Sequence, residues 1–202
     1  MWPWGHAAVG YLVYSLVVRS RGETPGGLAV LALGVGTQFP DLVDKPFGWT
    51  LGILPGGRSL AHSLLTFALV TAVLVYITRR SRHRRLTFAF SVGYLTHTLS
   101  DGLAAAVDGA YGELSYLLWP LLPMPAYETE QTFVAHFAQL SLDSWLAVEG
   151  GLIVLAIVLW QLDGRPGLAT VRRLSALSVR RVRQIVSQSR QGLPISPVRD
   201  SI

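Results

Sequence analysis

The 202-residue sequence contains no cysteine. That absence excludes a disulfide framework and any metal site built on thiolates. Charged residues are also scarce, at 14% of the chain, whereas soluble domains carry about 25%. Half of the residues are hydrophobic and the mean hydropathy is +0.41, a composition typical of a membrane protein. We expect a membrane-embedded domain over residues 1–163 and a basic tail over 164–202, amphipathic and partly disordered.

Hydrophobic segments divide the first 163 residues. Residues 59–78 and 86–107 are long enough to cross a bilayer core of about 30 Å, and residues 145–162 are close to the minimum length. Residues 6–18 and 27–39 are shorter and could be half-spans or spans shielded by neighbours. The expected fold class is therefore all-α, a polytopic membrane helical bundle with about five membrane segments.

The distribution of basic residues predicts an orientation in the membrane. Fifteen of the 17 lysines and arginines fall in residues 19–27, residues 79–85 and the tail after Gly164. Residues 40–57 contain only Lys45, and residues 108–144 contain no lysine or arginine. The positive-inside rule then places the N-terminus outside and the C-terminus in the cytoplasm of an inner or plasma membrane. The first apolar run lacks the basic start of a signal peptide, so we expect it to stay uncleaved.

The tail combines apolar and basic residues at helical spacing. Its apolar positions are Leu168, Val171, Leu174, Val182 and Ile185, with arginines between them. This pattern predicts an amphipathic helix on the anionic lipid of the inner leaflet, where each arginine contributes about 1 kcal/mol. Nucleic acid is the less favoured partner.

Ionisable residues interrupt the apolar segments, and the predicted topology puts them all at the outer end of the bundle. They are His6, Asp41, Asp44, Arg58, His62, His97, Asp101 and Glu149. Residues four apart share a helix face, so His97 and Asp101 should project together, as should Arg58 and His62. A carboxylate at membrane depth is costly and is by default a functional residue.

Imidazole and carboxylate ligands without thiolates suit Zn²⁺, Mn²⁺ or Fe²⁺. Facing helices of a bundle often build such sites, and one carboxylate can bridge two ions. The sequence therefore predicts a centre for one or two divalent ions, with Zn²⁺ favoured and Mn²⁺ as the alternative. Its predicted ligands are His6, Asp41, His62, His97 and Asp101.

Each residue also has a structural interpretation. Asp41 and Asp44 could be turn and cap residues beside Pro40 and Pro46, and His97 with Asp101 could form a neutral structural pair. Glu149 could pair with Arg58 or join the metal ligands. His136 is a further candidate in a segment without a clear assignment.

Four motifs occur in a fixed order: MWPWGH, PDLVD, RSLAHS and GYLTHTLSD. Together they resemble the YdjM-like family of predicted inner-membrane metal-dependent hydrolases, over roughly residues 1–125. The family pattern includes RxxTHS and GxxxHxxxD, and this chain departs from it at Ala61. The motif order is also distantly similar to that of zinc-dependent phospholipase C, which suggests a phosphoester substrate.

The resemblance implies a metal-dependent hydrolase built on a membrane-embedded helical bundle. Because the predicted topology would open the site toward the outer membrane face, a lipid or lipid-linked headgroup is the expected substrate. Asp44 would orient a ligand or act as a general base, and Arg58 would neutralise charge on a phosphoryl or carboxyl oxygen. Two alternatives stay open. The chain could be a non-catalytic metal-binding membrane protein, such as a transporter or sensor, or the polar residues could form a structural cluster without metal.

Overall fold

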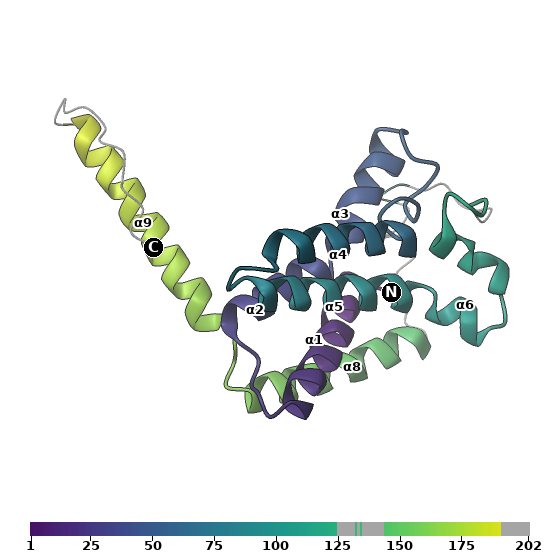
Figure 1. Ribbon diagram of the computed structural model, residues 1–202, viewed down its shortest axis with the longest axis horizontal. Coiled ribbons are helices and arrows are strands. Elements are labelled where there is room, and N and C mark those ends of the chain that lie inside the picture. The colour runs from purple at the N-terminus through teal and green to yellow at the C-terminus, as the bar shows by residue number, and fades with distance from the viewer. Residues whose placement is uncertain (125–131, 133, 135–143, 191–202) are drawn as a thin grey trace.

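The computed structural model describes residues 1–124, 132, 134 and 144–190. All regular structure in this part of the chain is helical. The helices are α1 (Pro3–Ser20), α2 (Gly27–Gly36), α3 (Phe39–Lys45), η1 (Pro46–Thr50), α4 (Leu64–Thr78), α5 (Arg84–Asp101), α6 (Leu103–Val107), η2 (Tyr111–Leu118), α8 (Ser144–Leu162) and α9 (Leu168–Arg190). Figure 1 shows α1, α2, α4, α5 and α8 gathered into one bundle, with α9 extending away from it.

The closest helix pair, α2 with α5, depends on glycine. A Cβ atom at Gly36 would collide with the carbonyl oxygen of Phe90, and one at Gly93 would collide with that of Leu33. Small residues at such a crossing let two backbones approach closely, as is common between membrane helices. This contact fixes the carboxyl end of α2 beside the second half of α5, which carries His97.

Helix α1 packs against α2, α5 and α8. The buried apolar side chains between these helices are few and of mixed size: Ala8, Tyr11, Tyr14, Val18, Ala29, Leu33, Ala89 and Ala156. Most of the other fully buried side chains are polar and lie toward one end of the bundle. The fold therefore joins a modest apolar core to a buried polar cluster.

One helix in the described part of the chain, α8, is long and apolar enough to cross a membrane. Helix α4 is apolar but shorter, at 15 residues. The five predicted membrane segments thus coincide with α1, α2, α4, α5 and α8, but length and composition identify only α8 as a span. The multi-pass topology stays a prediction.

Two predicted helix assignments are wrong in detail. Residues 51–63 form bends and turns, so Arg58 and His62 do not share a helix face. Helix α4 begins only at Leu64, where the Ser63 hydroxyl accepts a hydrogen bond from the Leu65 backbone nitrogen at 3.2 Å. The predicted segment 86–107 is also divided, because α5 ends at Asp101 and α6 begins after Gly102.

Candidate metal centre

Four chain segments bring the polar residues together at one end of the bundle. His6 lies in the first turns of α1, Asp41 in α3, His62 in the turn before α4, and His97 with Asp101 at the end of α5. In Figure 1 the N-terminus and the end of α5 lie at this same end. The three imidazoles are at most 1% exposed. The clustering that the topology predicted is therefore present.

Four ligand atoms converge at the centre of this cluster. One atom each of Asp41, His62, His97 and Asp101 lies within 4.8 Å of the other three. The two Nε2 atoms of His62 and His97 are 3.1 Å apart. Asp41 Oδ1 lies 3.5 Å from His62 Nε2 and 3.7 Å from His97 Nε2, and Asp101 Oδ2 lies 3.4 Å and 4.0 Å from them.

The partners of the other ring nitrogens explain why the two Nε2 atoms face each other. His97 Nδ1 donates to the backbone carbonyl of Thr37 at 2.7 Å, and a carbonyl oxygen can only accept. His62 Nδ1 lies 2.8 Å from Asp44 Oδ2 and donates to that carboxylate. In the neutral form of each ring, the Nε2 lone pair is therefore free and points toward the other imidazole.

Asp44 is built to hold His62. Its carboxylate is completely buried and accepts from the backbone nitrogens of Ser59 at 2.7 Å, Ala61 at 2.8 Å and His62 at 3.2 Å. Both oxygens of this buried carboxylate therefore have hydrogen-bond donors, as buried polar groups normally do. Asp44 therefore fixes both the turn at residues 59–62 and the orientation of the His62 ring.

His6 and His62 approach different oxygens of the Asp101 carboxylate. His6 Nε2 is 3.1 Å from Asp101 Oδ1, and His6 Nδ1 contacts the Ser100 hydroxyl at 2.9 Å. The His6 ring stacks on the His97 ring with centroids 3.7 Å apart. The Met1 amino group lies 3.1 Å from the same Asp101 oxygen. Asp101 thus directs one oxygen toward His62 and His97 and the other toward His6.

Besides the Met1 amino group, two side-chain cations border the centre. Lys45 Nζ lies 2.6 Å from Asp41 Oδ2, and Arg58 Nε donates to Asp101 Oδ2 at 2.9 Å. The Arg58 side chain is 35% exposed, whereas that of Asp101 is 3% exposed. Arg58 therefore connects the buried centre to the surface, although it comes from a turn and not from the predicted helix.

The remaining candidates have separate positions. Both Glu149 oxygens accept from the Trp2 backbone nitrogen at 3.2 Å, which ties α8 to the start of α1. His136 lies outside the described residues. Sequence reasoning missed Thr37 and Ser100, which contact His97 and His6. A backbone carbonyl has no sequence signal, whereas Ser100 could have been found from its place one residue before Asp101.

The arrangement fits a divalent cation. His6 Nε2 and Asp41 Oδ1 are buried and lie 3.1 Å from Asp101 Oδ1 and 3.5 Å from His62 Nε2, respectively. These ion-pair contacts do not meet hydrogen-bond geometry, whereas buried polar atoms normally make a hydrogen bond. Tetrahedral Zn²⁺ with bonds of about 2.0–2.1 Å separates its ligand atoms by about 3.3–3.4 Å. The ligand atoms around His62 Nε2 lie at similar distances from it, namely His97 Nε2 at 3.1 Å, Asp101 Oδ2 at 3.4 Å and Asp41 Oδ1 at 3.5 Å. Asp41, His62, His97 and Asp101 are the residues that could hold the ion, with Asp44 and Thr37 orienting the two imidazoles.

Fold and cluster together define a helical protein with a buried His and Asp group that could hold a metal ion. Comparison with known families is consistent with that class. Residues 1–173 match the family described as YdjM inner membrane protein, and the chain belongs to this family. The match reaches beyond the resemblance at residues 1–125 and includes all of α8 and the start of α9. No curated protein and no solved structure matches the chain.

Proposed function

We propose that the protein is a membrane-bound metal-dependent hydrolase that acts on a phosphoester or lipid-linked substrate at the outer membrane face. The observation that carries the proposal is the pair of facing Nε2 atoms of His62 and His97, 3.1 Å apart between the Asp41 and Asp101 carboxylates. The chemistry that a divalent ion such as Zn²⁺ or Mn²⁺ supplies at such a site is Lewis-acid activation of water and of a phosphoryl oxygen.

The geometry also suggests roles for the surrounding residues. Asp44 is a positioning residue, because all its contacts orient His62 or the turn that carries it. That role is favoured over general base, since the carboxylate is 0% exposed. Arg58 is the partly exposed cation at the centre and is suited to bind an anionic phosphoryl oxygen.

A second ion would involve His6. The carboxylate of Asp101 presents one oxygen to His62 and the other to His6, as expected of a bridging ligand between two ions. We propose His6 as the ligand specific to this second ion.

Exposed apolar side chains on α4 and α8 support a placement of the bundle in the membrane. Helix α4 exposes Leu65, Leu69, Val73 and Ile77, and α8 exposes Val154, Leu155, Val158 and Leu162. Apolar surfaces of this kind suit a bilayer better than water. We propose that the five helices α1, α2, α4, α5 and α8 lie in the membrane with the polar end outside, following the positive-inside rule.

Turnover of a lipid phosphoester tests the proposed function. Protein purified in mild detergent and supplied with Zn²⁺ or Mn²⁺ would be incubated with phosphatidylglycerol and phosphatidic acid, and products would be measured by mass spectrometry. We expect release of headgroup or phosphate by the wild type, at least about 100-fold less by His97→Ala, and unchanged release by His83→Ala, an exposed histidine. A metal-loaded wild type without turnover would contradict the hydrolase and favour the metal-binding transporter or sensor.

A further inference from the structure

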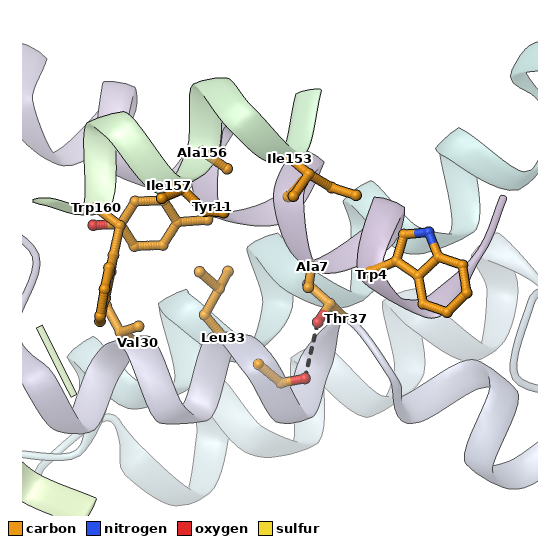
Figure 2. Close-up of a pocket in the computed structure, with 12 residues that line it drawn as sticks. Trp4, Ala7, Tyr11, Val30, Leu33, Thr37, Ile153, Ala156, Ile157 and Trp160 are labelled. Atoms are coloured by element: carbon orange, nitrogen blue, oxygen red, sulfur yellow. Dashed lines mark hydrogen bonds between the residues drawn. The ribbon is translucent and has the colours of Figure 1, made fainter. Parts of the chain in front are cut away.

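An open-sided cavity of about 310 Å³ lies between α1, α2 and α8, and none of the candidate metal ligands lines it. Its wall is mainly aromatic and aliphatic, as Figure 2 shows for Trp4, Val30, Leu33, Ile153, Ile157 and Trp160. None of the residues that line it carries a charge. The volume and lining are those of a ligand site and not of a packing defect, since ligand pockets begin at about 300 Å³ and are mostly apolar.

The two hydroxyl groups on the wall already have partners within the protein. The Tyr11 hydroxyl donates to Asp163 Oδ2 at 2.6 Å, and the Thr37 hydroxyl donates to the Gly34 carbonyl at 2.9 Å. Little hydrogen-bonding capacity of these two hydroxyl groups therefore remains for water or for a polar ligand. The wall therefore favours a hydrocarbon chain as the occupant.

The position of the cavity also favours hydrocarbon. One wall is formed by α8, the helix long and apolar enough to cross a membrane. Trp4 and Trp160 lie toward opposite ends of the cavity (Figure 2). With α8 in the bilayer, as proposed above, the solvent beside the cavity is acyl chains.

One end of the cavity lies beside the metal centre. Thr37 lines the cavity, and its backbone carbonyl accepts the hydrogen bond from His97 Nδ1. A chain in the cavity would thus place the headgroup to which it is attached near the His97 side of the metal centre.

We propose that this cavity binds one acyl chain of a membrane phospholipid and that the bound lipid is the substrate presented to the metal centre. The second half of this statement depends on the proposed hydrolase function. The first half does not, because chain binding needs neither metal nor turnover.

Gly34 offers a direct test. It lines the cavity, and a Cβ atom built on it meets no atom within 4 Å. Gly34→Phe would therefore fill the cavity without a backbone clash. Gly151→Phe is the matched control, since Gly151 is an exposed residue of α8 outside the cavity wall and also has open space around its Cβ.

The measurement is native mass spectrometry of each variant after incubation with dipalmitoyl phosphatidylglycerol in mild detergent. We expect about one lipid per chain in the wild type and Gly151→Phe, and occupancy lower by about tenfold or more in Gly34→Phe. Dihexanoyl phosphatidylglycerol, with the same headgroup, should bind at least about tenfold less tightly to the wild type. Equal lipid retention by Gly34→Phe and Gly151→Phe would overturn the proposal.

Two further variants separate the possible failures. Gly34→Leu fills less of the cavity and serves if Gly34→Phe does not fold, with lower lipid occupancy again expected and equal occupancy again contradicting the proposal. His97→Ala should retain the lipid, because Thr37 and the cavity wall are intact. Lipid retention with no turnover in any variant would leave the acyl-chain site standing and reject the hydrolase function.

Discussion

Two buried carboxylates at opposite ends of the bundle show what distinguishes a structural polar cluster from a candidate metal centre. Asp163 follows α8, and its buried side chain accepts from Tyr11 and Ser15 at 2.6 Å and from Arg19 at 2.8 and 2.6 Å. Every contact is a donor to an acceptor, as expected of a cluster that joins α1 to α8. Nothing there needs an ion.

The Asp101 end is arranged differently. Here two imidazole Nε2 atoms face each other, and the buried atoms Asp41 Oδ1 and His6 Nε2 have ion-pair neighbours at 3.5 Å and 3.1 Å but no contact with hydrogen-bond geometry. Buried groups left without partners carry a desolvation cost of about 1–3 kcal/mol each, and a cation between them would remove it. To recognise a candidate metal centre, the number of buried acidic residues is therefore less informative than whether each buried acceptor has a hydrogen-bond donor.

Removing a ligand should give the largest effect. We expect His62→Ala to weaken Zn²⁺ affinity by more than about 100-fold, because Nε2 of His62 lies within 3.5 Å of His97 Nε2, Asp41 Oδ1 and Asp101 Oδ2. Affinity would be measured by competition with a chelating indicator. His83→Ala, which changes an exposed histidine, is the control. Equal affinities in the two variants would make the Asp101 cluster structural, like that of Asp163.

Removing a positioning residue should give a smaller effect. Asp44→Asn keeps the size of the side chain but loses the carboxylate that holds His62 Nδ1, so we expect Zn²⁺ affinity to fall by about 10–100-fold. Asp108→Asn, at an exposed aspartate, controls for loss of one negative charge. If Asp44→Asn bound Zn²⁺ as the wild type does, the orientation of His62 would not depend on Asp44.

Changing Asp163, the buried carboxylate at the end of the bundle away from Asp101, should affect stability and leave metal binding unaltered. Burial raises the pKa of Asp163, but the hydrogen bonds from Ser15, Tyr11 and Arg19 outweigh it and lower the pKa below its ordinary value of 3.8. A carboxyl with a lowered folded-state pKa stabilises the fold above its ordinary pKa, and this contribution disappears as the pH falls through the folded-state pKa.

We therefore expect Asp163→Asn to lose about 1–3 kcal/mol of unfolding free energy at neutral pH. The difference from the wild type should shrink as the pH falls below 3.8, as measured by thermal unfolding in detergent. Zn²⁺ affinity should not change. Loss of metal in this variant at neutral pH would show that the two ends of the bundle are coupled, which the comparison excludes.

Much of this site could be predicted from the sequence because polar residues in apolar segments are rare. His97 and Asp101 do share a face of α5, and both contribute to the four-residue group. The four-residue spacing of Arg58 and His62 predicted a shared helix face, and this prediction is wrong. The Gly-rich segment before Leu64 folds as turns, which hydrogen bonds to Asp44 stabilise.

Other features had no usable signal in the sequence. The Thr37 carbonyl that orients His97 is a backbone group, and its position depends on the Gly36 and Gly93 contact between α2 and α5. Asp163 was overlooked because it follows the last apolar segment, where an acidic residue is ordinarily solvated. Its partners Tyr11, Ser15 and Arg19 are about 150 residues distant in the chain.

The most direct test of the central claim is the metal content of the protein itself. Wild-type protein would be purified in mild detergent without added metal or chelator, and bound metals would be measured by inductively coupled plasma mass spectrometry before and after incubation with Zn²⁺ or Mn²⁺. The account predicts about one or two ions per chain, lost in His97→Ala and in Asp101→Ala. Well-folded wild type that binds neither metal after incubation would contradict it and make the buried His and Asp group a structural cluster.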